Sequence, residues 1–328
     1  MVSVATPAPP TGRRPGGLAA RTARTVARRL LLGVLVVWGA ATAGFAALQL
    51  LPGDPVRIIL GPNTEVAPEV VAQLRHTYGL DRSLPEQYLS FVGGLLRGDL
   101  GTSYQLRQPV ADVLSAELGQ TLLLAATALA GAFLLAVLVA TLTAGRRGPG
   151  RALASAVELV LISTPVFWLG VLLLTAFSFT WQLFPVAGNG GVDALVLPAL
   201  ALALPLGALL TQVLRSGLEE ALEQPFTVTA RTRGLSESRV RWSHALRHGL
   251  LPTVTMAGWL LGGLLGGAVV TESVFSRQGL GRITLQAVNS KDMPVVVGVL
   301  VLSAIVFVLV NLAVDLLCTV IDPRLRSR

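Results

Sequence analysis

Residues 121–144 of the chain read TLLLAATALAGAFLLAVLVATLTA, and none of them carries a charge. A helix of about 20 apolar residues matches the hydrocarbon thickness of a bilayer, so this stretch predicts a membrane span. Other apolar runs lie at about residues 30–51, 154–180, 194–214, 251–271 and 295–321. We therefore expect an all-α, polytopic membrane protein with six transmembrane helices, because only helices and closed barrels satisfy the backbone inside lipid.

The composition excludes an ordinary soluble enzyme. Of the 328 residues, 52% are hydrophobic and only 13% are charged, which is about half the charged share of a soluble domain. The net charge is +8, but the Arg residues flank the apolar runs. That placement favours a topology signal over nucleic-acid binding. Cys318 is the single cysteine, so no disulfide can form within the chain, and we expect a small buried apolar residue there.

The basic residues also predict the orientation. The tail 1–29, the loops 145–153 and 215–250 and the C-terminus 322–328 hold 18 of the 26 Lys and Arg residues. By the positive-inside rule, these segments and both termini are cytoplasmic. The tail is expected to be disordered. The run 30–51 is long for a secretory signal, which favours an uncleaved anchor, although the small residues at 43–47 leave cleavage open.

The segment 52–119 is predicted to be an extracytoplasmic helical cap. Pro68 and Pro85 each open a short helical pattern, and glycines close both patterns. A third short helix near Val110 is expected to lead into the second span. The remainder, 120–321, is the predicted core of five further helices.

The loop 215–250 is basic and predicts a protruding helical hairpin. Pro225 should end the helix that leaves the membrane, and residues 226–233 can form a short helix. Gly234 then supplies a stop, and Ser236 is expected to cap the helix that leads to the next span. A hairpin of this size is too short to fold alone, so its apolar side must be buried against a partner.

The motifs of this loop resemble the cytoplasmic loop of bacterial ABC-importer permeases, and in particular the B-type subunit of the peptide/nickel permease family. They are TARTRGLS at 229–236, HALR at 244–247 and LP at 251–252. Outside the loop, the similar motifs are LPGDP at 51–55, YGLD at 78–81, GDLG at 98–101, GLG at 279–281 and DPR at 322–324. The resemblance implies the type I ABC importer permease fold.

It also implies that the loop couples the membrane helices to a cytoplasmic ATPase. The coupling residues would then be Phe226, Ala230, Arg231, Arg233, Gly234 and Leu235. Val228 stands where the general loop pattern has Glu, and Thr229 stands where it has its first Ala. Which contact the missing Glu would have made is left open.

The resemblance further implies a cell-membrane complex of a second related permease (C-type), two ABC ATPase subunits and an extracytoplasmic solute-binding protein. The implied substrates are dipeptides or oligopeptides, with nickel, glutathione or another small solute as alternatives.

The sequence predicts no catalytic residue, cofactor or metal site. A phosphate-binding P-loop needs Gly-Lys-Ser/Thr, whereas the only lysine, Lys291, lies between Ser290 and Asp292. The permease is therefore not expected to be an enzyme, and ATP hydrolysis falls to partner subunits. His244 and His248 have a zinc-compatible spacing, but no cysteine or carboxylate joins them nearby.

An ion-coupled secondary transporter is the main rival interpretation. Such proteins usually contain internal repeats and buried ionisable residues. No repeat between the two halves is visible, and charges within the runs are scarce. A membrane-embedded enzyme would need a nucleophile or metal cluster at bilayer depth, and none is seen.

Small and kink-forming residues mark three of the spans. The fifth contains four glycines that permit close helix approach, either to a partner permease or within the subunit: Gly262, Gly263, Gly266 and Gly267. Pro165 and Pro205 should kink the third and fourth spans, and such kinks either line a pathway or reflect irregular packing. Glu158 and Asp315 lie near span ends, where solvation, or Asn311 in the case of Asp315, can satisfy them.

Overall fold

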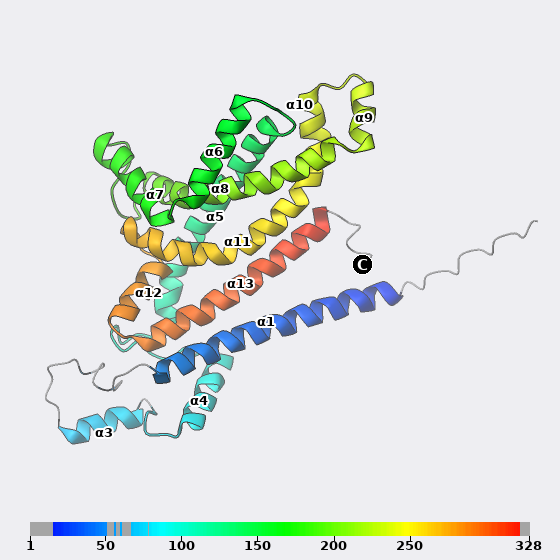
Figure 1. Cartoon of the computed structure of the whole chain (residues 1–328). Helices are drawn as coiled ribbons and strands as arrows, with labels where there is room; N and C mark the ends of the chain where they lie inside the picture. Colours follow the sequence, from blue (N-terminus) through cyan, green and yellow to red (C-terminus); the bar gives the residue numbers. More distant parts are fainter. Residues whose placement is uncertain (1–15, 51–55, 57–59, 61–66, 78, 322–328) are drawn as a thin grey trace, which may run out of the picture.

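The computed structural model describes residues 16–321 except 51–55, 57–59, 61–66 and 78. Within that part the chain is a bundle of helices (Figure 1). Their bounds are α1 Gly16–Leu50, α3 Pro68–Thr77, α4 Leu84–Leu96, α5 Val110–Thr143, α6 Pro149–Ser163, α7 Val166–Leu173, the π-helical η1 Leu174–Thr180, α8 Asp193–Leu222, α9 Pro225–Thr232, α10 Glu237–Val240, the π-helical η2 Arg241–Ala245, α11 Leu246–Val274, α12 Leu280–Asn289 and α13 Met293–Ile321.

By length and composition, four described helices can each cross a bilayer: α1, α5, α8 and α13. Two bent pairs raise the number to six. One pair joins α6 to α7–η1 at an angle of 108°, and the other bends by 56° within α11, between Leu264 and Gly266. The predicted six-span, all-α architecture is therefore confirmed, with two of its spans bent.

Four boundaries differ from the sequence-based expectation. The first helix, α1, begins at Gly16, so residues 16–29 of the tail that was expected to be disordered are helical. The short helix expected near Val110 is instead the first part of α5, which runs unbroken to Thr143. The third span breaks at Pro165, a change of direction far larger than a kink. The fourth span continues to Leu222, so Arg215 lies inside α8 rather than in the loop. Pro205 also lies inside α8, which continues through it.

Small residues bring the central pair of helices together. On α5, alanines recur every fourth residue from 128 to 144, and all of them are fully buried. On α8, a Cβ at Gly207 would lie 3.1 Å from the carbonyl oxygen of Ala132. Backbones that approach this closely gain dispersion contacts, which drive helix association in lipid. The α5–α8 pair is therefore the centre of the bundle, on which α6, α7, α11 and α13 pack.

The first span lies at the edge of the bundle, alongside α13 (Figure 1). A Cβ at Gly33 would lie 2.6 Å from Val308, and one at Gly44 would lie 3.3 Å from Val297. Near its outer end α1 also holds α4, through a hydrogen bond between the hydroxyls of Thr42 and Tyr88 (2.8 Å).

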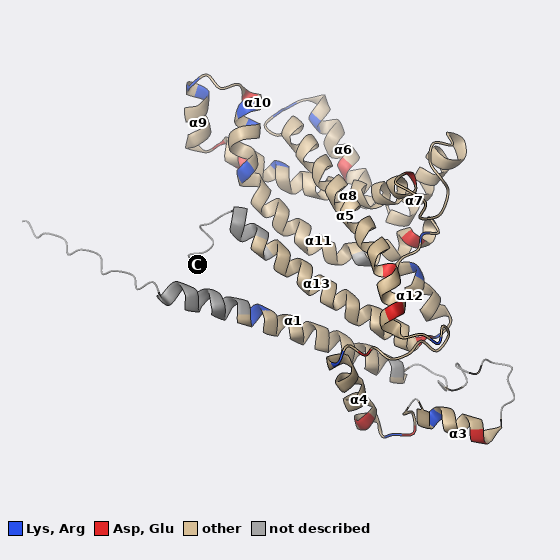
Figure 2. Ribbon diagram, turned by 180° about the vertical axis from the view of Figure 1, so that it is seen from behind, with Lys and Arg blue, Asp and Glu red and all other residues tan. Residues whose placement is uncertain are grey.

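Both ends of the described chain lie on one side of the bundle. The start of α1 and the end of α13 are on the same side as α9 and α10, whereas α3, α4 and α12 are on the other (Figure 1). Figure 2 shows basic positions gathered around α9, α10 and the start of α6. We call the side with α9 and α10 the knob end, after the projection formed by residues 225–245, and the side with α3, α4 and α12 the outer end.

Candidate functional site

The knob, residues 225–245, projects from the bundle between α8 and α11 (Figure 1). Pro225 occupies the first turn of α9, where its missing N–H costs nothing. Gly234 follows with a φ of 81°, a left-handed conformation that favours glycine. The hydroxyl of Ser236 then accepts a hydrogen bond from the N–H of Arg239 and caps α10. The predicted helix, stop and capped helix are therefore all present.

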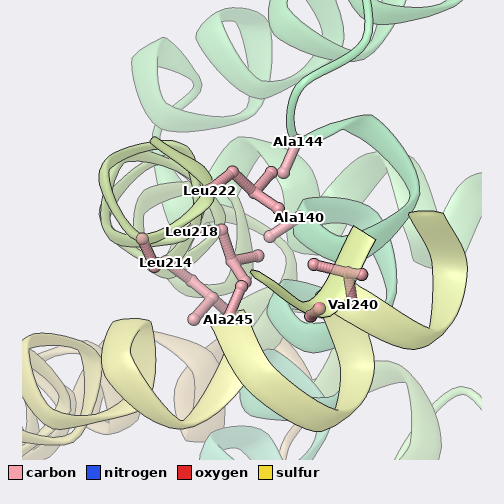
Figure 3. Close-up of a cluster of buried hydrophobic side chains, with 9 residues drawn as sticks. Ala140, Ala144, Leu214, Leu218, Leu222, Val240 and Ala245 are labelled. Atoms are coloured by element: carbon pink, nitrogen blue, oxygen red, sulfur yellow. The ribbon is translucent and has the colours of Figure 1, made fainter. Parts of the chain in front are cut away.

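The inner face of the knob is buried on the ends of α5 and α8. Ala230, Val240 and Ala245 are each at most 5% exposed. They pack with Leu214, Leu218 and Leu222 of α8 and with Ala140 and Ala144 at the end of α5 (Figure 3). Phe226 and Leu235 pack at the edge of this cluster. The apolar side that the sequence left without a partner is thus covered by the bundle itself.

Arginine side chains join the knob to two helix ends. Arg241 donates to the carbonyl oxygen of Ala144, which follows α5, at 3.0 Å. Arg231 donates to the carbonyl oxygen of Leu222, the last residue of α8, at 3.2 Å. It also forms a two-pronged ion pair with Glu237, with distances of 2.7 and 3.3 Å. Cations are favourable at helix C-termini, where carbonyl groups lack partners within the helix. These bonds therefore hold the knob in one orientation.

The outward face of the knob presents a different set of residues. Val228 is 53% exposed, and Thr229, Arg233 and Gly234 are exposed as well. Of the six residues predicted to couple, four thus support the knob from within: Phe226, Ala230, Arg231 and Leu235. Only Arg233 and Gly234 face outward.

One of the two histidines of this region has an aromatic partner. His248 stacks on Phe226 with ring centroids 4.8 Å apart. Among the described residues, no group of three or more His, Cys, Asp or Glu side chains could hold a metal ion.

The four glycines predicted to matter in α11 differ in what surrounds them. A Cβ at Gly262 would lie 2.6 Å from Phe307, and one at Gly267 would lie 3.2 Å from Leu202. These two glycines therefore serve packing within the subunit. At Gly263 and Gly266 a Cβ would meet nothing within 4 Å, so these two leave their side of the helix open.

Two ion pairs that the sequence did not predict join α6 to α8. Glu158 pairs with Arg215, and both side chains are 6% exposed. Arg151 pairs with Glu219, with exposed fractions of 36% and 31%. Glu158 had been expected near solvent, and Arg215 in the loop. The spacing places residues 151 and 158, and residues 215 and 219, on one face of their helices, but it does not show that these two faces meet. The side chains of Asp315 and Cys318 lie outside the described part of the structure.

At the outer end, a buried carboxylate organises the turn between α11 and α12. Glu272 accepts from the hydroxyl of Thr121 (2.6 Å) and from the N–H groups of Gly281 (2.8 Å) and Arg282 (3.2 Å). It thus satisfies the N-terminus of α12. A Cβ at Gly281 would lie 2.2 Å from the Cα of Val269, which explains the glycine there. We call Glu272, Thr121 and the start of α12 the outer node.

Two further buried charges fix the loops around the outer node. Arg277 donates to the carbonyl oxygen of Ala194 at 3.0 Å. Burial lowers the pKa of Arg277, and the charge of Glu272 opposes that effect. Asp292 accepts from the N–H of Tyr104 at 3.0 Å and from the hydroxyl of Ser103, so it ties the outer segment to the start of α13.

Comparison with known proteins gives the same assignment along the whole chain. Residues 115–327 match the family model described as "Binding-protein-dependent transport system inner membrane component". Residues 22–125 match the model for the N-terminal part of such a membrane component.

Curated relatives extend over nearly the whole chain. It is 35% identical to the glutathione transport system permease protein GsiC of Salmonella paratyphi A, over 92% of this chain and 99% of that protein. It is 36% identical to the dipeptide transport system permease protein DppB of Escherichia coli K12, over 92% of this chain and 98% of that protein.

Solved structures support the fold. An inward-facing form of the MetNI methionine ABC transporter matches with a TM-score of 0.54 at 20% identity, over 63% of this chain and 95% of that one. A second crystal form matches with a TM-score of 0.51 at 23% identity, over 64% and 96%. The chain therefore belongs to the family of binding-protein-dependent transport system inner membrane components, as a peptide/nickel-type ABC importer permease.

Proposed function

We propose that this permease forms half of a translocation pathway for short peptides and is driven through the knob by a cytoplasmic ATPase. The observation that carries the proposal is the construction of the knob. Its inner face is built into the ends of α5 and α8, and its outer face leaves Val228 and Arg233 exposed. A projection that is rigidly joined to two spans can transmit a displacement to both.

The exposed face indicates what the ATPase surface should offer. Val228 would pack in an apolar pocket of the ATPase, and Arg233 would donate hydrogen bonds to a carboxylate or a carbonyl group there. Arg231 is already satisfied by Glu237 and Leu222, so its role is to hold the knob's shape. Val228 takes the place of the Glu in the general loop pattern, which makes this contact apolar where other permeases have a polar one.

The remaining partners follow from the family and from the open faces of the chain. We propose a second, C-type permease, two ATPase subunits and an extracytoplasmic solute-binding protein. Gly263 and Gly266 have open space beside them, which suits close approach by the second permease. Both termini are proposed to be cytoplasmic, because the start of α1 and the end of α13 lie at the knob end.

The proposed cargo is a dipeptide, an oligopeptide or a glutathione-like tripeptide. The relatives named for glutathione and for dipeptides are about equally similar to this chain. Both names denote short peptides, so the class is better supported than its individual members.

The test is cross-linking in the assembled transporter, in a Cys318→Ser background that removes the only native cysteine. Val228→Cys should cross-link to cysteines placed along the surface groove of the ATPase. Lys291→Cys, which is exposed at the outer end, is the matched control and should not. If Val228→Cys in intact cells is labelled by an impermeant external thiol reagent, the proposal is overturned.

Transport completes the test. Proteoliposomes with the full complex and its binding protein should take up a labelled dipeptide or glutathione only when ATP is supplied on the side of the membrane that carries the ATPase subunits. Arg233→Ala should reduce this uptake by about tenfold if one charge-assisted bond to the ATPase is lost. ATP-independent uptake that follows a proton or sodium gradient would instead favour a secondary transporter.

A further inference from the structure

Helix α6 packs on few neighbours in the bundle. It begins after Gly148, whose φ is 129°, and ends at the break before Pro165, where the chain turns by 108°. Its described packing is against α8 and, to a smaller extent, α5. On its other faces Leu153, Leu159 and Val160 are each more than 60% exposed. A helix bounded by a turn at each end depends on these few contacts for its position.

Those contacts include two ion pairs of opposite polarity. On α6 the order is Arg151, Ser155, Glu158, and on α8 it is Arg215, Glu219. Arg151 pairs with Glu219, and Glu158 pairs with Arg215. The hydroxyl of Ser155 accepts a further bond from Arg215 at 3.0 Å. We call these five residues the clasp.

The alternation of charge fixes how α6 lies on α8. The two helices run antiparallel, so a slide of one turn would bring Arg151 opposite Arg215. Like charges that lie opposite each other repel. The Glu158–Arg215 pair is buried, and repulsion is least screened in such a buried place. The clasp therefore allows one register.

The same turns of α8 also support the knob. Leu214, Leu218 and Leu222 pack on the knob's buried residues, while Arg215 and Glu219, interleaved with them, hold α6. The end of α8 is thus a shared support, with the knob on one face and α6 on another.

We propose that the clasp makes α6 move as one unit with α8 and the knob, so that it is a positioning element for coupling ATP hydrolysis to transport. This inference rests on the proposed function. The buried pair is also incompletely satisfied, since Glu158 Oε2 and Arg215 Nε have no partner among the described residues. Buried pairs of this kind contribute little net stability and are better suited to fixing geometry.

The experiment measures peptide uptake and ATP hydrolysis in the same proteoliposomes containing the complete transporter. Glu158→Gln leaves Arg215 without its counter-charge, and uptake per ATP should fall by about tenfold, within the usual range of coupling between sites. Hydrolysis itself should persist. Arg147→Gln, an exposed basic residue just before α6 that is outside the clasp, is the matched control and should leave the ratio unchanged.

A covalent rescue separates coupling from general damage. In the Cys318→Ser, Glu158→Gln background, the substitutions Arg151→Cys and Glu219→Cys replace the Arg151–Glu219 ion pair with two thiols. A short bifunctional thiol reagent should restore most of the uptake per ATP, because the link replaces the lost attachment.

Two outcomes overturn the inference. If the cross-link lowers uptake further while hydrolysis continues, α6 must separate from α8 during transport. If Glu158→Gln leaves uptake per ATP at the native value, the clasp has no role in coupling. Failure of the proposed function is distinguishable from both, because the unmodified complex would then show no ATP-dependent uptake at all.

Discussion

At the outer end of the bundle, the carboxylate of Glu272 accepts hydrogen bonds from N–H groups at the start of α12. At the knob end, Arg231 and Arg241 donate to carbonyl groups at the ends of α8 and α5. Each end thus places the charge that complements the local helix dipole. The difference is that the knob end also carries a partly exposed ion pair. Glu272 is fully buried and Arg241 is 8% exposed, whereas Arg231 and its partner Glu237 remain 36% and 58% exposed.

That difference separates a buried structural joint from the surface that we propose receives the ATPase. A buried carboxylate with three donors cannot be released without leaving several polar groups unpaired. A partly exposed ion pair contributes little to stability by itself. Here it holds the shape of the knob, whose outward face remains exposed. Substitutions at the two ends test this contrast.

Removing the buried acid should cause the largest loss. Glu272→Ala leaves the N–H groups of Gly281 and Arg282 and the hydroxyl of Thr121 without their acceptor. We expect a destabilisation of about 3–5 kcal/mol, as for breaking other buried charge networks. The measurement is the temperature at which purified protein ceases to elute as a single species in size-exclusion chromatography. Glu272→Gln, which keeps an acceptor oxygen, should lose less; equal behaviour of both variants and the native chain would refute the outer node.

Adding one methyl group at the outer node should be nearly as damaging. In Gly281→Ala the new Cβ meets the backbone of Val269 at 2.2 Å, and backbone atoms cannot rotate away. Overpacking of this kind costs about 1–3 kcal/mol or more. Gly266→Ala, on the open side of α11, is the control and should leave the isolated chain's thermal stability unchanged. A stability loss in both variants would show that Gly266 also packs within the subunit.

At the knob end, Arg241→Ala should have an intermediate effect. The carbonyl of Ala144 loses its buried donor, which costs about 1–3 kcal/mol. Hydrogen exchange of peptides from 225–245 should accelerate, while peptides from α12 keep their protection. Arg233→Ala should leave both regions unchanged in the isolated chain, since its side chain is exposed. Faster exchange in the knob of Arg233→Ala would mean that this residue supports the fold rather than a partner.

The smallest effect is expected at α4, on the surface of the outer end. The N–H of Ser83 donates to Glu86 at 3.0 Å, and this bond lowers the pKa of Glu86. A lowered pKa stabilises the start of α4 above the carboxyl's unfolded pKa, and the benefit disappears as pH falls through the folded value. Exchange of residues 84–90, corrected for the intrinsic pH dependence, should therefore accelerate slightly in acid. Glu86→Gln should remove that pH dependence; an unchanged acid response in the variant would assign it elsewhere.

Much of the fold was predictable because lipid imposes strict requirements on the chain. Long apolar runs without charges had to be spans, and Pro225, Gly234 and Ser236 carry local signals that act within a few residues. The sequence could not show that Arg233 is exposed while Arg231 is paired within the knob, since both are arginines within one short helical turn. Only the tertiary arrangement decides which of them meets Glu237.

The two charge networks were harder to foresee for a related reason. Arg215 was assigned to the loop because charges usually end a span, yet Glu158 on another helix provides its counter-charge. The partner lies 57 residues away in sequence, and no local pattern reports such a pairing. The bend at Pro165 was expected in position but not in size, because a proline permits a turn whose angle is set by the surrounding packing.

The π-helical turn η2, Arg241–Ala245, has a consequence for how this protein can be altered. Such a turn contains one more residue than a regular α-helical turn. It therefore rotates the helix on one side of it by about 100° about the helix axis relative to the helix on the other side. A single-residue deletion there would regularise the helix and rotate the knob relative to α11, so that its exposed face would no longer meet the proposed ATPase in the same orientation. Insertions and deletions, more than substitutions, are therefore the changes that this stretch should tolerate least.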